Sequence, residues 1–289
     1  MFEIVKNYRD NEALRHSFNE LAGKTFGLNF EDWYQNGFWT DNYNPYSVVI
    51  DGRVVANVSV NRTDMEINGE VKHFLQLGTV MTEESYRNRG LSRKIMEQIE
   101  ADFDGKVDGY YLFGNDSVLD FYPRFGFRKA KEYYQYSKKV SNTGTAQVKK
   151  AIMKNPESWK QLESVMNRNV FRGRFDMVNN NELIMFYVTK FMQENVFYHE
   201  ATDTYVIAEP EGESLFIHNV FSTTIEDLGE VIALFGEEIK EVTLGFVPME
   251  TEGYTVTEYH EEDCTFFIKG EALNAVELDK LRIPTLSHA

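Results

Sequence analysis

A basic loop, Arg87-Asn88-Arg89-Gly90-Leu91-Ser92-Arg93, stands directly before a segment in which Leu91, Ile95 and Ile99 recur at helical spacing. The start of a helix presents unpaired backbone N–H groups and a partial positive charge, and both favour an anion. A glycine there lets a phosphate approach the backbone, and flanking arginines add charge. The loop therefore predicts an anion cradle, although an exposed basic loop that caps a helix is the simpler interpretation.

Patterns that would indicate a metal or a dinucleotide are missing from the sequence. The six histidines show no paired ligand spacing, and His260-Glu261-Glu262-Asp263 is most simply a solvated turn. No two glycines stand two residues apart, as a dinucleotide fingerprint requires. Cys264 is the single cysteine, which excludes an internal disulfide and a thiolate cluster and suits a reducing compartment. We expect no metal.

The elements that must position the basic loop are an antiparallel meander and the helix after the loop. Asp51-Gly52 and Asn68-Gly69 are turns typical of hairpins. A helix is expected at residues 12–21, and a strand at 108–114 leads into a short helix that begins at Asn115. The expected meander strands are residues 47–50, 53–61, 65–67 and 71–80, the last of them running on to Thr82 at the basic loop.

An aromatic stretch lies between the first helix and the meander. Polar residues and glycine interrupt it too often for a regular helix. Core packing is the simplest interpretation, and one wall of a ligand pocket is the alternative. The stretch contains Trp33, Tyr34, Phe38, Trp39, Tyr43 and Tyr46.

Two motifs of the first half resemble signatures of the GCN5-related N-acetyltransferase (GNAT) family. Arg87-x-x-Gly90-x-Ser92 is similar to the family's pyrophosphate-binding signature, with Ser92 in place of the usual glycine or alanine. Phe121-Tyr122-x-x-x-Gly126-Phe127 is similar to the signature after the fifth strand. The resemblance implies an α/β (α+β) fold, with a mixed central sheet flanked by helices, and acetyl-CoA as co-substrate.

The same resemblance assigns the coenzyme site residue by residue. Strand-four backbone groups would pair with the pantetheine arm in the splay between strands four and five, and the loop amides and arginines would hold the pyrophosphate. Asn115 would contact the coenzyme arm. The coenzyme-binding set is Val80, Met81, Thr82, Arg87, Asn88, Arg89, Gly90, Leu91, Ser92, Arg93 and Asn115.

Tyr122 is implied as the catalytic residue that protonates the departing thiolate. A phenol with a pKa near 10 is protonated at pH 7 and can donate; a purely packing role is the alternative. Gln76 stands where some family members carry a glutamate that acts as the general base. Glutamine cannot take up the proton, so the base is unassigned. Glu31, Asp32 and the terminal carboxylate after His288-Ala289 are candidates, and the predicted substrate contacts are Asp32, Trp33 and Trp39.

The second half repeats the order of elements without the motifs. At the position of the basic loop it has Ser222-Thr223-Thr224-Ile225-Glu226-Asp227, whose acids would repel pyrophosphate. We expect a second, degenerate GNAT-like domain that opens its helix with a capping box at Thr223 and Glu226. The tandem plan is similar to the enhanced-intracellular-survival (Eis) type, whose members acetylate aminoglycosides or lysine side chains. The predicted parts are a catalytic domain at 1–140, a linker at 141–150 and the degenerate domain at 151–289.

The charge is uneven and constrains the partners. The chain has 30 basic and 46 acidic residues, and the half after residue 140 carries net −13. This sign opposes nucleic-acid binding, and the short apolar runs exclude a membrane helix, so a cytoplasmic protein is expected. The expected acceptor is a primary amine on a small polycationic molecule, such as an aminoglycoside or a polyamine. The alternatives are a protein or peptide amine, or a coenzyme-binding regulatory module without turnover, and homo-oligomerisation stays open.

Overall fold

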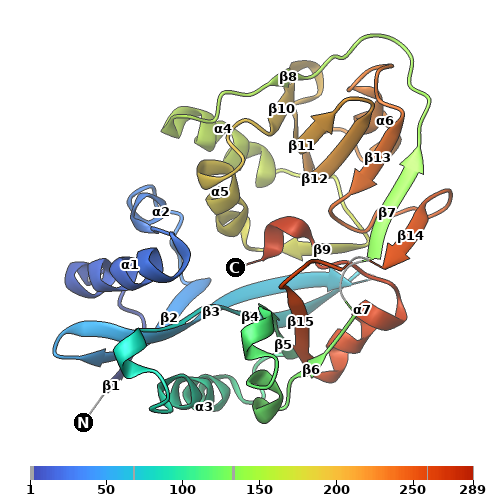
Figure 1. The fold of residues 1–289 in the computed structure, drawn as a ribbon. Coiled ribbons are helices and arrows are strands. Elements are labelled where there is room, and N and C mark those ends of the chain that lie inside the picture. Colours follow the sequence, from blue (N-terminus) through green and yellow to red (C-terminus); the bar gives the residue numbers. More distant parts are fainter. Residues whose placement is uncertain (1–2, 68, 132–133, 259, 289) are drawn as a thin grey trace.

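The computed structural model describes residues 3–67, 69–131, 134–258 and 260–288, which form two mixed sheets with helices packed on them (Figure 1). It confirms the predicted α/β class. In the first sheet the strands lie in the order β1, β2, β3, β4, β5, β15, β6. Their bounds are β1 Glu3–Val5, β2 Tyr43–Ile50, β3 Arg53–Ile67, β4 Glu70–Thr82, β5 Gly109–Gly114, β15 Thr265–Lys269 and β6 Arg128–Lys129.

The first hairpin forms at the predicted turn, because Asp51 and Gly52 both take the positive φ angles that a tight hairpin turn demands, 49° and 75°. The third strand is longer than predicted. The sequence separates residues 53–61 from 65–67, whereas β3 is continuous, since Thr63 and Met65 are fully buried at alternate positions and carry the inward face across the gap. Strand β9 (Phe175–Val178) pairs with the far end of β3.

Helices cover both faces of the first sheet. Helix α3 (Leu91–Phe103) buries Leu91, Ile95 and Ile99 on one face, as predicted from their spacing. Helices α1 (Glu12–Phe26) and α2 (Glu31–Gln35) pack on the other face. Short 3-10 turns complete this half: η1 Glu84–Tyr86, η2 Asp116–Val118 and η3 Tyr122–Phe125.

A splay opens between β4 and β5 at the centre of this sheet. The two strands pair in parallel only from Phe74 to Gln76, opposite Gly109 to Tyr111. Beyond that point β4 runs on to Thr82 and β5 to Gly114, and the two strands no longer pair with each other. Helix α3 follows β4 at the open end of this gap, so the basic loop lies where the gap opens. We call the gap between the unpaired ends of β4 and β5 the slot.

The second sheet repeats the first, and each half contributes one strand to the other. Its order is β8, β10, β11, β12, β13, β7, β14, with β12 and β13 as the parallel pair. Strand β7 from the first half lies between β13 and β14, and β15 from the second half lies between β5 and β6. The bounds are β7 Tyr134–Lys139, β8 Lys149–Lys150, β10 Val196–His199, β11 Thr204–Glu211, β12 Ser214–Ser222, β13 Glu241–Leu244 and β14 Thr255–Glu258.

This exchange corrects the predicted domain bounds. The division between sheets does not fall at residue 140, because residues 134–139 belong to the second sheet and residues 265–269 to the first. The expected linker does not bridge the halves either. It crosses the second half, where the Asn142 amide donates to the carbonyls of Ile232 and Gly236 at 3.0 and 3.1 Å, and its end forms β8.

The second half carries the helices α4 (Pro156–Met166), α5 (Asn181–Lys190), α6 (Leu228–Ala233) and α7 (Asn274–Leu278). The predicted capping box at Thr223 is wrong: α6 begins later, where the Asp227 carboxylate accepts from the Glu230 amide at 3.0 Å. The remaining 3-10 turns are η4 Glu200–Thr202, η5 Glu271–Leu273 and η6 Thr285–Ser287.

The second splay, between β12 and β13, is filled by the C-terminal segment. The Thr285 amide donates to the Gly245 carbonyl at 2.9 Å, and a Cβ on Gly245 would lie 2.5 Å from the Thr285 hydroxyl. This contact gives a physical reason for the predicted degeneracy, since the chain itself occupies the place of a coenzyme arm. In the described residues, no helix has both the length and the apolar character to cross a membrane.

Candidate active site

The basic loop lies at the exposed start of α3, with Gly90 as its N-cap in the left-handed region at φ 74°. No atom lies within 4 Å of a Cβ built on Gly90, so the approach to the backbone is open. The first helical hydrogen bond runs from the Lys94 amide to the Gly90 carbonyl at 3.2 Å, which leaves the preceding amides of the first turn without helical partners. The backbone at this position is therefore open to a ligand, and the anion cradle stays a prediction.

Side chains hold the loop in shape. The Arg87 guanidinium donates to the Thr82 carbonyl at 3.3 Å, and Arg89 donates to the Ser85 carbonyl at 2.8 Å. The Ser92 hydroxyl lies 3.0 Å from that of Thr82, so the serine that departs from the family pattern ties the helix to the end of β4.

A bulge in β4 distinguishes the slot from an ordinary strand edge. The register against β3 shifts between Asn57 and Ser59, and Thr79 takes a φ of 47°, which is strained for a β-branched residue. The Asn57 amide donates to the Thr79 carbonyl and to the Ser59 hydroxyl, both at 2.9 Å. The Thr79 hydroxyl lies 2.7 Å from that of Tyr43.

Tyr122 lies at the start of η3 with its ring against the end of β5. A Cβ on Gly114 would lie 3.0 Å from this ring, so glycine is needed for the approach. Tyr122 is 3% exposed, and the centre of its ring lies 5.3 Å from that of Phe267. Burial alone raises the pKa of Tyr122 to about 12, which keeps the phenol protonated and able to donate at neutral pH.

A cavity of about 340 Å³ joins the slot to the helices on one face of the sheet. Gly78, Thr79 and Val80 of β4 line it, with Tyr122 and Asn115 on the opposite side. The Asn115 side chain accepts from the Ser117 amide at 3.2 Å, which caps η2. Of the predicted coenzyme residues, Val80 and Asn115 therefore lie on the cavity wall, while Met81 is buried in the core under α1.

The predicted substrate and base residues lie in different places. Trp33 lines the cavity, whereas Trp39 is buried in the aromatic core and donates to the Tyr43 carbonyl at 3.0 Å. Asp32 lies outside the wall, 3.1 Å from the Lys190 ammonium. Glu31 is bound by Arg15 at 2.9 Å, so neither acid is placed to take a proton from an amine in the cavity.

Sequence reasoning did not place α5 or His288 at the cavity. It offered the terminal carboxylate after His288 as a candidate base, and Ala289 lies outside the described residues. Phe186 and Tyr187 of α5 line it, and so does His288, whose ring stacks on Phe113 at 4.0 Å. The Tyr187 hydroxyl donates to the His288 carbonyl at 2.7 Å. The available signal was that residues 183–192 are apolar nearly all round, since such a helix must be buried or lie at an interface.

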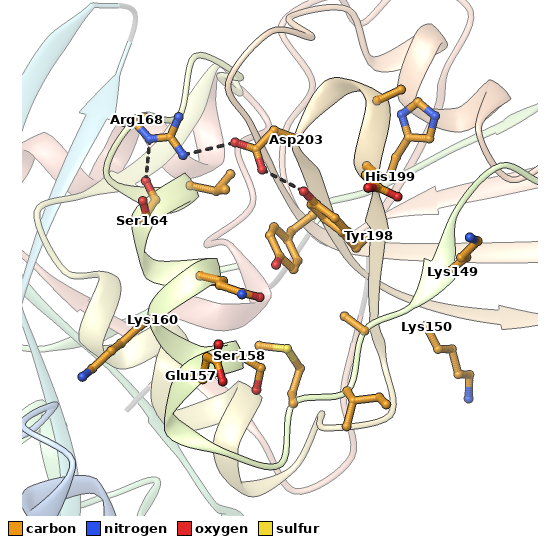
Figure 2. Close-up of a pocket in the computed structure, with 18 of the residues that line it drawn as sticks. Lys149, Lys150, Glu157, Ser158, Lys160, Ser164, Arg168, Tyr198, His199 and Asp203 are labelled. Atoms are coloured by element: carbon orange, nitrogen blue, oxygen red, sulfur yellow. Dashed lines mark hydrogen bonds and ion pairs between the residues drawn. The ribbon is translucent and has the colours of Figure 1, made fainter.

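A larger hollow of about 1420 Å³ lies in the second half, between α4 and β10 (Figure 2). One ion pair crosses it, in which Arg168 donates to Asp203 at 3.1 Å, and Asp203 also accepts from the Tyr198 hydroxyl at 3.1 Å. None of the motif residues line it. Among the described residues, no three His, Cys, Asp or Glu side chains gather as metal ligands would.

The fold is that of known acyltransferases. A conserved protein of Enterococcus faecalis, described as a probable N-acyltransferase, has a TM-score of 0.59 at 14% identity, over 93% of this chain and 72% of that one. Eis1 of Mycobacterium abscessus has a TM-score of 0.54 at 13% identity, over 92% and 72%. A GCN5-related N-acetyltransferase of Kribbella flavida has a TM-score of 0.53 at 14% identity, over 93% and 70%.

Residues 9–130 match the family model of the acetyltransferase (GNAT) domain. Residues 9–130 therefore form a GNAT acetyltransferase domain, which confirms the expected class of enzyme, an N-acetyltransferase, for this part of the chain. A search of curated protein sequences finds no match to the chain.

Proposed function

We propose that this protein transfers the acetyl group of acetyl-CoA to a primary amine, with Tyr122 as the proton donor. The observation that carries the proposal is the cavity that joins the β4–β5 slot to Tyr122, with the open cradle at Gly90 at the end of the same strand. A pantetheine arm in the slot would leave the pyrophosphate at the start of α3. The residues that face the slot fit such a co-substrate.

In this mechanism the amine nitrogen attacks the thioester carbonyl, a C–N bond forms and the C–S bond breaks. The β4 backbone beyond the Thr79 bulge stabilises the negative charge that develops on the carbonyl oxygen. Tyr122 gives its proton to the departing sulfur and regains one from the nitrogen of the tetrahedral intermediate. The second half supplies α5 and His288 to close the site.

Two observations bear on the acceptor: the net charge of the second half and the residues of the cavity wall. The acidity of the second half favours a polycation such as an aminoglycoside or a polyamine by long-range attraction. The cavity wall adds no support for a polycation, since none of its described residues is Asp or Glu.

The single cysteine supports the proposed cytoplasmic location.

The test is Tyr122→Phe, which removes the hydroxyl and keeps the ring. We expect kcat to fall about 100-fold or more, with the acetyl-CoA dissociation constant unchanged by calorimetry. Tyr110→Phe is the matched control, because Tyr110 is also buried and its pKa is also raised to about 12, but it does not line the cavity.

Free thiol release from acetyl-CoA gives the rate. Equal rates for Tyr122→Phe and Tyr110→Phe would remove Tyr122 from the chemistry. Acetyl-CoA binding without turnover of any amine would instead favour the coenzyme-binding module.

A further inference from the structure

The cavity has two parts, and the part outside the coenzyme slot is apolar. Phe30 and Trp33 enter it from the first half, and Phe186 and Tyr187 from α5. Phe30 stacks on Phe186 with ring centres 5.2 Å apart, and Trp33 meets Phe186 edge-on at 5.6 Å. These contacts make one continuous aromatic wall.

The mouth of the cavity is apolar as well. Phe26 at the end of α1 and Phe191 at the end of α5 both line it, and they are 46% and 57% exposed. Large apolar side chains that remain exposed next to a cavity are typical of ligand contacts.

Charged groups are absent from the described lining of this cavity, which contains no Asp, Glu, Lys or Arg. The nearby helices do carry charges, and two of these pair with each other: Asp32 of α2 and Lys190 of α5 lie 3.1 Å apart. The Trp33 indole, the most polar point of the α2 wall, donates to the Glu182 carbonyl at 2.9 Å. A bound polycation would bury several ammonium groups against this wall, whose described residues offer no carboxylate to compensate their desolvation.

We infer that the acceptor is a monoamine with an apolar body, aromatic or alkyl, and that the aromatic wall promotes loss of the ammonium proton by excluding water. The inference rests on the proposed function and names its substrate class. Burial disfavours the charged form of an amine, so the proton leaves to water as the amine enters, and the neutral nitrogen attacks. This step needs no general base from the described residues of the cavity wall.

The environment of His288 is consistent with this preference for neutral groups. Burial, together with the charge of Arg282, lowers the pKa of His288 to about 3, so this imidazole on the cavity wall is neutral at physiological pH. Aromatic faces still offer a single ammonium a weak initial contact.

The test compares 2-phenylethylamine and hexylamine with spermidine and kanamycin, with acetyl-CoA as donor and thiol release as readout. We expect kcat/KM to be about 100-fold higher for the monoamines. Calorimetry with coenzyme A present should show binding of phenylethylamine and none of spermidine at the same concentration.

A variant at the mouth of the cavity distinguishes an effect on amine binding from an effect on the stability of the fold. Phe191→Asp places a carboxylate beside the cavity at an exposed position, and we expect phenylethylamine to lose about 10-fold in kcat/KM. Leu278→Asp is the control, since Leu278 is 80% exposed on α7 and does not line the cavity. This variant should keep the kcat/KM of the native chain for phenylethylamine.

Each other outcome overturns the inference. Faster turnover of spermidine or kanamycin would leave the acetyltransferase function standing and remove the apolar acceptor. A marked preference for a longer acyl-CoA over acetyl-CoA, with no selectivity among amines, would assign the aromatic wall to the acyl chain. Intact acetyl-CoA binding with no amine turned over would remove the proposed function together with the inference.

Discussion

Gly90 is the residue at which the left-handed backbone conformation and the proposed pyrophosphate binding coincide. Any side chain there is strained at φ 74°, and a glutamate also places a negative charge at the helix start. We expect Gly90→Glu to weaken acetyl-CoA binding about 100-fold or more. Isothermal titration calorimetry measures the acetyl-CoA dissociation constant of this variant and of the native chain.

The control for this variant is Gly105→Glu. Gly105 also has a positive φ, 64°, and open space around it, but it lies in the turn after α3. It carries the same strain and the same charge away from the cradle, so it should bind acetyl-CoA normally. Equal affinities of the two variants would place the pyrophosphate elsewhere.

His288 gives the cavity a pH dependence. Its folded-state pKa, about 3, lies below the ordinary value of 6.5, so the unfolded chain takes up a proton first as the pH falls. Stability is therefore fully present above pH 6.5 and is lost at roughly 1 kcal/mol per pH unit below it. His288→Phe keeps a ring for the stack on Phe113 and cannot titrate.

Melting temperatures of both proteins between pH 7 and pH 5 check this expectation. The native chain should lose stability relative to His288→Phe as the pH falls. Parallel curves would mean that the imidazole takes up a proton without leaving the cavity wall.

At this scale the sequence indicated the residues of the proposed cradle and Tyr122, because their motifs are local. It could not place Phe186 or His288, since each reaches the cavity only through contacts between distant segments. Asp32 was chosen for its acidity, and it is an ion-pair partner of Lys190 instead. Which acids are paired depends on packing that residue types do not encode.

The β4 bulge is the element that shapes the slot, and Asn57 holds it. Asn57→Asp keeps the acceptor for Ser47, at 2.8 Å, and loses the donor to the Thr79 carbonyl. We expect kcat to fall about 10-fold or more with little change in acetyl-CoA affinity, because the loss concerns the alignment of backbone groups with the acyl carbon.

Asn142→Asp is the matched control. It loses two donations to backbone carbonyls in the second half, far along the chain from the slot. Its stability should fall, while kcat is kept. Equal loss of kcat in both variants would indicate a general effect of a destabilised fold.

Helices and hairpins were predictable at the scale of elements, because the spacing of Leu91, Ile95 and Ile99 and the turn at Asp51-Gly52 act locally. The position of β7 was not. Its short strand pairs with residues more than 100 positions away, so no local pattern reveals which sheet it joins.

The whole molecule shares one core between its sheets. Met65 and Tyr111 of the first sheet belong to the same buried cluster as Leu244 and Val206 of the second. We therefore expect a single cooperative unfolding transition. Leu244→Ala, at a fully buried position, should lower the melting temperature by roughly 5–15 °C and keep one transition.

Differential scanning calorimetry checks this with acetyl-CoA as a second probe. In the proposed function acetyl-CoA binds the first half, yet it should raise the melting temperature of the whole transition. Two transitions, with only one raised by acetyl-CoA, would show that the halves unfold independently in spite of the exchanged strands.

The exchange of β7 and β15 also has a consequence for synthesis on the ribosome. Strand β5 has no partner on its far side until residues 265–269 have been made, although its own half is complete more than 120 residues earlier. At about 5–20 residues per second, the nascent first half waits roughly 10 s with an open sheet edge. Its acquisition of coenzyme affinity should therefore be one of the last events of translation, and chaperones that shield exposed strands would act in that interval.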